Sequence, residues 1–245
     1  NAKPLIRGLE TEVKFAPPIK LARLLRRGCL DAALAPVAEA FHWPGYKILE
    51  GASISSFGPV QSVILACLGP LEKLRRVVLD RESVTSVLLL RVILEKYTGI
   101  KPEYVVGKSG ENPGRHDGLL LIGDRALRRC LEPGRYEISD LGRLWTERTG
   151  LPFVYAAWLL RDDCRDPDLP QRLLAARRKG MKEMSSIIRG NDAFDPETIR
   201  EYLTRRIRFG WGPGHRKALR LFQESALEIG ALRRRISPKF LRVGE

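Results

Sequence analysis

Apolar residues recur with two periods along this chain, in short extended runs and in longer stretches of helical spacing. Residues 12–16 and 30–36 have the composition of strands, and residues 19–27 between them have the spacing of an amphipathic helix. Residues 54–68 form a longer extended stretch that is interrupted by a Gly-Pro pair. Alternating strands and helices of this kind predict a mainly parallel sheet covered by helices.

A second series of strands and helices follows in the middle of the chain. We expect strands over residues 76–80, 103–107 and 118–123, and helices over residues 84–97, 125–131 and 140–149. Another long apolar run covers residues 151–160, and the remainder has helical spacing over residues 169–188, 196–207 and 215–232.

Two long extended runs on either side of a central α/β block predict a two-lobed clamshell with a C-terminal helical segment. We place the first, discontinuous lobe at residues 1–66 and 160–245, and the second lobe at residues 67–159. The ligand is expected in the cleft between the lobes, where strand ends and helix N-termini meet.

The composition is that of a globular protein with an apolar core. The chain has 245 residues, of which 44% are hydrophobic and 29% are charged, and no apolar run reaches the length of a membrane span. These features predict a cytoplasmic protein with no membrane partner. The chain begins at Asn1 in a turn-like segment, so we expect that some upstream residues are absent from this sequence.

The net charge of +14 is the one unusual feature of the composition. It is compatible with binding to nucleic acid, to an acidic membrane surface or to an anionic small substrate. The basic residues are widely spread and are not interleaved with aromatic residues, so we predict no nucleic-acid partner. The four cysteines and three histidines lack metal-ligand spacing, and we therefore predict no metal. The oligomeric state is left open.

Two hydroxyl-rich stretches, residues 55–62 and 80–86, lie at turns beside apolar segments. The second opens directly onto a predicted helix. Hydroxyl groups and unpaired N–H groups at a helix N-terminus favour an anion, because the helix dipole adds to the hydrogen bonds. Two such stretches predict a small ligand with more than one carboxylate or phosphate group.

Several segments resemble one enzyme family in their order and spacing. They read NAKPL (1–5), GCLDAALAP (28–36), GPVQS (58–62), TSV (85–87), LIGDRAL (121–127), DLG (140–142) with Trp145, and TGLPFV (149–154). With these segments the chain resembles the chorismate dehydratases of the futalosine route to menaquinone. The resemblance covers nearly the whole chain and implies the two-lobed fold of type II periplasmic solute-binding proteins.

The resemblance also implies the reaction, which is loss of water from chorismate to give 3-[(1-carboxyvinyl)oxy]benzoate. Because aromatisation drives this elimination, the carbon–oxygen lyase needs no cofactor, and its task is to hold a dianionic substrate in the eliminating conformation. The implied catalytic residues are Asn1 and Ser62. The expected substrate-binding residues are Gly58, Pro59, Val60, Thr85, Ser86 and Asp124.

An asparagine is not a general base at ordinary pH, so Asn1 is expected to orient the substrate, and the substrate's own enolpyruvyl carboxylate is our hypothesis for the proton acceptor. Each residue also has a structural alternative. Asn1 is a possible turn residue, and Ser62 a possible solvent-facing strand residue. Thr85, Ser86 and Asp124 are possible helix caps.

One departure from the family pattern and one contrast with a related family bear on this resemblance. Residues 109–116 form a loop-like insert that is shorter than its counterpart in the family. The related dihydroxynaphthoate synthases typically carry a Pro-Asn-Asp-Thr turn and a later histidine, neither of which we identify here, and this favours the dehydratase. The alternative functions are a solute-binding or sensor protein for an anionic metabolite on the same fold, and a basic regulatory or nucleic-acid-binding protein.

Overall fold

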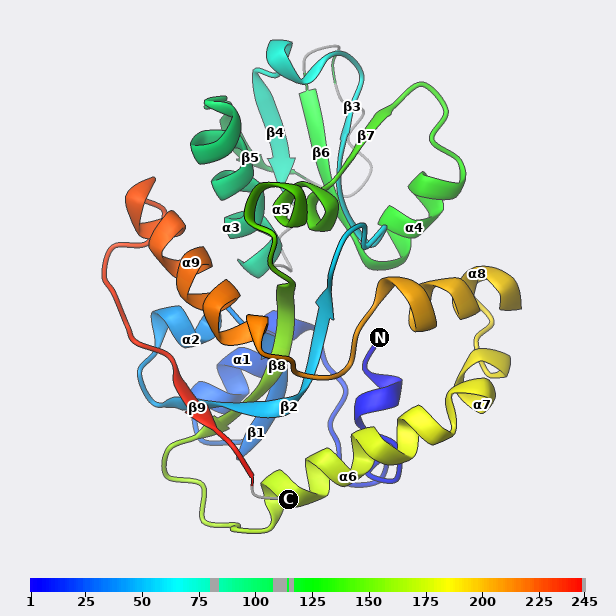
Figure 1. Cartoon of the computed structure of the whole chain (residues 1–245), viewed down its shortest axis with the longest axis vertical. Helices are drawn as coiled ribbons and strands as arrows, with labels where there is room; N and C mark the ends of the chain where they lie inside the picture. The colour runs from blue at the N-terminus through cyan, green and yellow to red at the C-terminus, as the bar shows by residue number, and fades with distance from the viewer. Residues whose placement is uncertain (80–83, 108–113, 115–116, 244–245) are drawn as a thin grey trace. The chain divides into compact units, whose positions relative to one another are not determined.

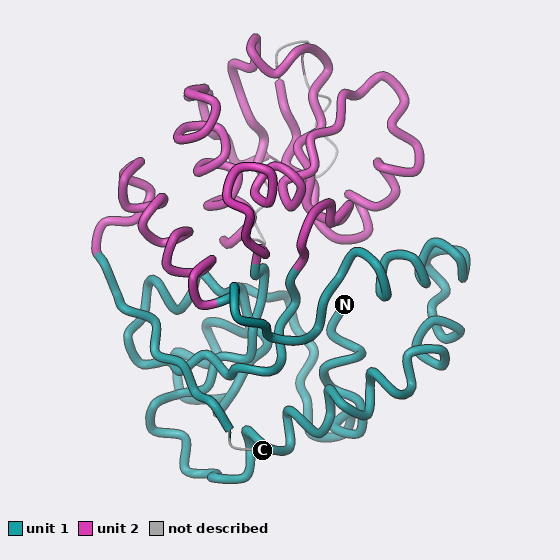
Figure 2. Tube along the Cα trace, in the orientation of Figure 1, with its two compact units in different colours: residues 1–55, 154–215, 235–245 teal, residues 56–153, 216–234 magenta. Residues whose placement is uncertain are grey.

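The computed structural model describes residues 1–79, 84–107, 114 and 117–243. The chain divides into two compact units (Figure 2): unit 1 contains residues 1–55, 154–215 and 235–245, and unit 2 contains residues 56–153 and 216–234. These bounds differ from the predicted lobes, since residues 56–66 and 216–234 group with unit 2 and residues 154–159 with unit 1.

Unit 1 is built on a mixed four-stranded sheet of order β1-β8-β2-β9 (Figure 1). The strands are β1 (Ala32–Pro36), β2 (Tyr46–Ser56), β8 (Phe153–Arg161) and β9 (Lys239–Leu241). The helices of this unit are η1 (Lys3–Leu5), α1 (Pro18–Arg26), α2 (Glu39–His42), α6 (Leu169–Lys182), α7 (Met184–Arg189), α8 (Pro196–Glu201) and η4 (Tyr202–Arg206).

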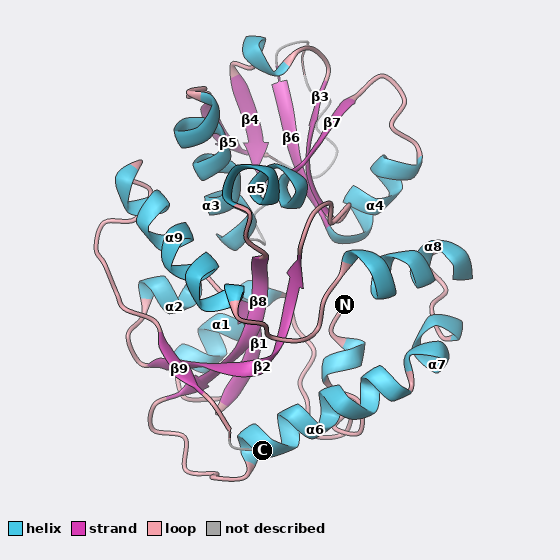
Figure 3. Ribbon diagram, in the orientation of Figure 1, coloured by secondary structure: helices cyan, strands magenta, loops and turns pink. Residues whose placement is uncertain are grey.

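Unit 2 contains a five-stranded sheet of order β5-β4-β6-β3-β7 (Figure 3). The strands are β3 (Val63–Cys67), β4 (Arg76–Leu79), β5 (Glu103–Val106), β6 (Asp117–Ile122) and β7 (Glu137–Asp140). The helices are η2 (Leu71–Lys73), α3 (Val84–Arg91), η3 (Val92–Thr98), α4 (Gly123–Leu131), α5 (Leu141–Thr149) and most of α9 (Gly214–Glu228).

The α/β class is confirmed, but the prediction of mainly parallel sheets is wrong. β4 runs parallel to β5 and β6, whereas β3 runs antiparallel to both of its neighbours, β6 and β7. In unit 1, β1 is antiparallel to β8 and β2 is parallel to β9. The reason is that β3 enters its sheet against the direction of both of its neighbours, and β8 against the direction of β1, which hydrophobic periodicity does not reveal.

An aromatic cluster explains why residues 216–234 belong to unit 2. The Phe222 ring of α9 lies 5.8 Å from the ring of Trp145 and 4.9 Å from that of Phe153, both edge to face. Trp145 and Phe153 are themselves 5.3 Å apart, and all three side chains are almost fully buried. Such pairs contribute more than the burial of their area alone.

Two local differences from the predicted elements have simple causes. Residues 12–16 are not a strand, because the N–H groups of Glu12 and Val13 bond to the Leu9 carbonyl in a turn. The predicted helix over residues 84–97 begins as α3 and continues as the π-helix η3. None of the helices within the described ranges is long and apolar enough to cross a lipid bilayer.

Candidate active site

The turn before β3 and the first residues of two helices lie together at one edge of the unit 2 sheet. In the sheet register Val63 is paired with Ile122, the last residue of β6, and Ile64 with Asp140, the last residue of β7. Because β3 is antiparallel to both strands, it starts where they end. α4 follows β6 and α5 follows β7 without a loop, so both helix N-termini lie at this edge (Figure 3).

The buried carboxylate of Asp140 holds the turn in place. It accepts hydrogen bonds from the N–H groups of Val60, at 3.1 and 3.0 Å, and of Gln61, at 2.6 Å. As the N-cap of α5 it also accepts from the Arg143 N–H at 2.9 Å. Both carboxylate oxygens are therefore occupied, so Asp140 is a structural anion that fills the N-terminus of α5.

Further contacts fix the rest of residues 58–62, from α4 and α5. The Gly58 N–H donates to Thr146 Oγ1 at 2.9 Å, and the Gly123 N–H donates to the Ser62 carbonyl at 2.8 Å. Gln61 has a φ of 61°, and among the described residues it is the one non-glycine with a positive φ. A strained residue of this kind persists only where its surroundings determine it, which here they do.

The predicted residues Gly58, Pro59, Val60 and Ser62 all lie in this turn. Ser62 is 4% exposed, so the alternative that it faces solvent from a strand is wrong. Val60 is fully buried, and its N–H is bonded to Asp140. The turn therefore presents the Ser62 hydroxyl within a fixed backbone.

The predicted residues on α3 and α4 differ in exposure. Thr85 and Ser86 are the second and third residues of α3, and both are almost completely buried. Asp124 is exposed in the first turn of α4, whose N-cap is Ile122, so the alternative that Asp124 is the helix cap is wrong. Residues 80–83 of the second hydroxyl-rich stretch, and residues 109–116 except Gly114, lie outside the described part of the chain.

Asn1 belongs to unit 1, whereas the other predicted site residues belong to unit 2. Its Nδ2 donates to the hydroxyl of Tyr202 at 2.7 Å, across 201 positions of sequence. Tyr202 is buried in η4 and fixes the amide of the exposed Asn1. Asn1 is thus more than a local turn residue.

A buried polar group in unit 1 was not found from the sequence. His215 Nδ1 lies 3.0 Å from the Gly212 nitrogen and 3.2 Å from the Gly212 carbonyl oxygen, and Nε2 forms a hydrogen bond of 3.1 Å with Ser55 Oγ. Burial lowers the pKa of His215, and the charge of Arg208 lowers it further. Ser55 and His215 are 160 positions apart, so no spacing in the sequence indicates the pair.

Comparison with known proteins now defines the family. The family model described as menaquinone biosynthesis matches residues 1–228. The chain belongs to this menaquinone-biosynthesis family. A chorismate dehydratase from Thermus thermophilus is 37% identical over 210 residues, which cover 76% of each chain. A chorismate dehydratase from Campylobacter jejuni is 36% identical over 81 residues, or 32% of this chain and 35% of that protein.

Solved structures confirm the fold of this member of the menaquinone-biosynthesis family. A crystal structure of an Archaeoglobus fulgidus protein matches with a TM-score of 0.66 at 16% identity and covers 94% of both chains. A periplasmic sulfonate-binding protein from Methylobacillus flagellatus matches with a TM-score of 0.51 at 12% identity, over 88% of this chain and 73% of that one. The predicted type II periplasmic-binding-protein-like fold is therefore confirmed.

Proposed function

We propose that this protein is a chorismate dehydratase, a hydro-lyase that converts chorismate to 3-[(1-carboxyvinyl)oxy]benzoate in menaquinone biosynthesis. The observation that carries the proposal is the 37% identity to the chorismate dehydratase of Thermus thermophilus over 76% of the chain. The match of residues 1–228 to the menaquinone-biosynthesis family supports it. The cytoplasmic location, the lobe boundaries and the ligand position between lobes stay predictions, as does the absence of a nucleic-acid partner.

The reaction is balanced without a co-reactant. The bond from the ring to its hydroxyl group breaks, and a proton leaves the neighbouring ring carbon, so that one molecule of water departs. The electron pair of the broken C–H bond completes the aromatic ring. The protein's contribution is to orient the substrate and to stabilise the departing charge with fixed dipoles.

In unit 2, Ser62 supplies a hydroxyl to the substrate from the turn of residues 58–62. The occupied N-terminus of α5 is no anion site, because the Asp140 carboxylate already fills it. We assign a substrate carboxylate to the first turn of α3, with Thr85 and Ser86. Asp124 would repel a carboxylate at close range, so its side chain suits the substrate's hydroxyl group instead.

In unit 1, Asn1 orients the substrate by hydrogen bonds, and Tyr202 holds the amide in position. A neutral amide does not remove a proton at ordinary pH, and Asp140 has both oxygens occupied. The substrate's own enolpyruvyl carboxylate is therefore our proposed proton acceptor. An Asp124→Asn variant tests this assignment, because turnover would survive the substitution only if Asp124 is not the base.

The proposed function is tested by incubating the purified protein with chorismate and detecting 3-[(1-carboxyvinyl)oxy]benzoate by chromatography and mass spectrometry. We expect protein-dependent product, and a decrease of about 10- to 1,000-fold in Asn1→Ala and Ser62→Ala. Ser185→Ala, at an exposed position of α7, is the matched control and should keep full activity. Binding of chorismate without turnover would overturn the lyase and favour the solute-binding or sensor alternative.

A further inference from the structure

Three arginines of the described chain have a buried Nε atom without a hydrogen-bond acceptor: Arg129, Arg177 and Arg206. Arg206 pairs with Glu201, and the guanidinium of Arg129 lies 4.3 Å from the centre of the Tyr136 ring. Arg177 has neither kind of compensation, since no ion pair or hydrogen bond joins its guanidinium to another described residue. It is a partly buried cation without an anionic partner among the residues that the structure describes.

The surroundings of Arg177 connect it with Asn1. A Cβ atom at Gly210 would lie 3.0 Å from Arg177 Nη2, so the guanidinium packs directly on this glycine. One turn further along the same face of α6, a Cβ at Gly180 would lie 2.0 Å from the Pro4 carbonyl oxygen. α6 therefore lies against both the segment that begins with Asn1 and the segment that follows η4.

Tyr202 joins the N-terminal segment to the segment that follows it, within unit 1. It begins η4, which leads into the segment with Gly210, and its hydroxyl bonds to Asn1 Nδ2. Asn1 and Arg177 therefore both contact the stretch from Tyr202 to Gly210, Asn1 through the Tyr202 hydroxyl and Arg177 through Gly210. Both residues belong to the same compact unit.

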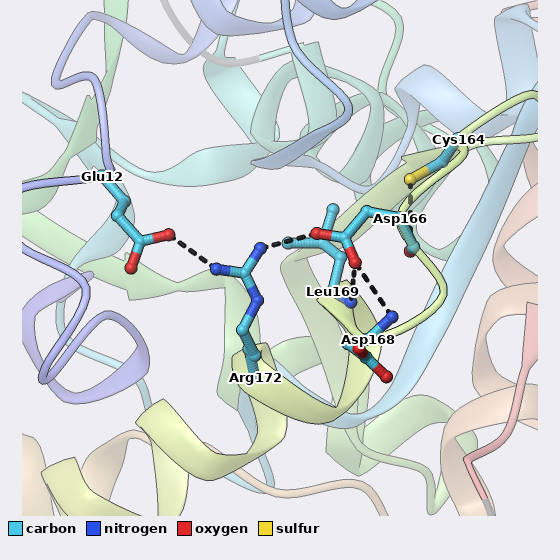
Figure 4. A network of polar contacts seen from close by, with 6 residues as sticks. All are labelled: Glu12, Cys164, Asp166, Asp168, Leu169 and Arg172. Atoms are coloured by element: carbon cyan, nitrogen blue, oxygen red, sulfur yellow. Dashed lines mark hydrogen bonds and ion pairs between the residues drawn. The ribbon is translucent and has the colours of Figure 1, made fainter.

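Polar contacts near both ends of α6 fix its position on the N-terminal segment. Arg172 donates to Glu12 and Asp166, each at 2.7 Å, and Asp166 accepts from backbone N–H groups at the start of the helix (Figure 4). Next to the other end, Glu183 pairs with Arg7. These contacts hold α6, and with it the base of the Arg177 side chain, against the segment that begins with Asn1.

The electrostatics of Arg177 favour a bound anion. Burial lowers the pKa of its guanidinium, and the neighbouring charge of Arg178 lowers it further. Removing a cation from water without an opposite charge is unfavourable, and a carboxylate ligand would offset that cost. The planar guanidinium matches a carboxylate with two parallel hydrogen bonds, which a lysine does not reproduce.

We infer that Arg177 binds one carboxylate of the dianionic substrate within unit 1, the unit that also contains Asn1. The inference rests on the proposed function and deepens it, because it assigns a cation of this chain to one of the two carboxylates.

The test compares the wild type with Arg177→Gln, Arg177→Lys and the charge-matched control Arg178→Gln, at the exposed neighbouring position. Steady-state kinetics with chorismate should show a KM about 10- to 100-fold higher for Arg177→Gln, with a much smaller change in kcat. Arg177→Lys should recover part of the loss, and Arg178→Gln should match the wild type. Equal KM values for both glutamine variants would overturn the inference.

A binding experiment tests this inference separately from the proposed function. Calorimetry measures the affinity of each variant for the dicarboxylate 3-[(1-carboxyvinyl)oxy]benzoate and for the monocarboxylate 3-hydroxybenzoate. The affinity for the dicarboxylate should fall about 10-fold or more in Arg177→Gln and persist in Arg178→Gln. A matching fall for the monocarboxylate would assign Arg177 to the ring carboxylate, and an unchanged monocarboxylate affinity would assign it to the enolpyruvyl carboxylate. Wild-type protein without turnover of chorismate would contradict the proposed function, whereas turnover with an unchanged affinity for the dicarboxylate in Arg177→Gln would contradict only the role of Arg177. Thermal melting confirms that each variant is folded.

Discussion

The carboxylate of Asp140 accepts a hydrogen bond from the backbone N–H of Gln61 at 2.6 Å and thereby holds this residue at a φ of 61°. The two residues are 79 positions apart. The contact joins the N-cap of α5 to the turn that carries Ser62. It makes the geometry of the candidate site depend on a residue that does not itself face the substrate.

Asp140→Asn should lower the free energy of unfolding by about 1 to 3 kcal/mol, because the amide has one acceptor oxygen where the carboxylate has two and leaves a buried N–H group unsatisfied. Turnover should decrease together with stability. Urea denaturation measures the effect, and Asp195→Asn is the control, since Asp195 caps α8 at an exposed position. An equal loss of stability in both variants would show that Asp140 is an ordinary helix cap.

Gly180→Ala should destabilise unit 1 and displace the segment that begins with Asn1. A Cβ at this position would lie 2.0 Å from the Pro4 carbonyl oxygen, so the backbone of one segment must move. Overpacking of this kind typically costs about 1 to 3 kcal/mol. Thermal melting and proteolysis of the N-terminus measure the change. Gly190→Ala is the control, because its Cβ would meet the Ser186 carbonyl at an ordinary 3.5 Å, and a similar loss there would argue against the steric explanation.

The buried His215 should make the protein less stable as the pH falls. Its pKa in the folded state is lowered from the ordinary 6.5 by burial, so below pH 6.5 the unfolded chain binds the proton that the folded chain excludes. Each unit of separation between the two pKa values corresponds to about 1.4 kcal/mol. Between pH 7.5 and 5.5, wild type should lose more stability than His215→Gln in urea denaturation. His42→Gln, at an exposed position, should retain the wild-type pH dependence, and identical slopes in all three proteins would refute the expectation.

The cysteines should react with iodoacetamide in the order of their exposure. Burial raises the pKa of Cys67 and of Cys130 to about 11, so at pH 8 roughly 0.1% of either thiol is ionised. Cys29 is exposed and should be labelled at least about 10-fold faster than Cys67. Peptide mass spectrometry after short labelling gives the order, and labelling in urea, where all cysteines are accessible, is the control. Early modification of Cys67 would mean that β3 opens readily.

Some features of the site were predictable because they depend on local sequence. The Gly-Pro pair before β3 marks a turn by the backbone preferences of these residues, and Asp140 precedes a helix as N-caps commonly do. The partners of these residues were not predictable. Asn1 and Tyr202 are 201 positions apart, and neither residue type specifies the other as its hydrogen-bond partner.

Most of the helices and strands, the α/β class and the resemblance to the menaquinone-biosynthesis family were predictable from the sequence, because periodicity and ordered motifs are properties of neighbouring residues. Three features became apparent only in the folded chain: the antiparallel direction of β3, the grouping of most of α9 with unit 2 through Phe222, and the Arg177 guanidinium without an anionic partner in the described ranges. These features depend on which distant segments pack together. Strand direction, burial and ion pairing arise from that packing, and a linear pattern of polar and apolar residues is compatible with more than one arrangement.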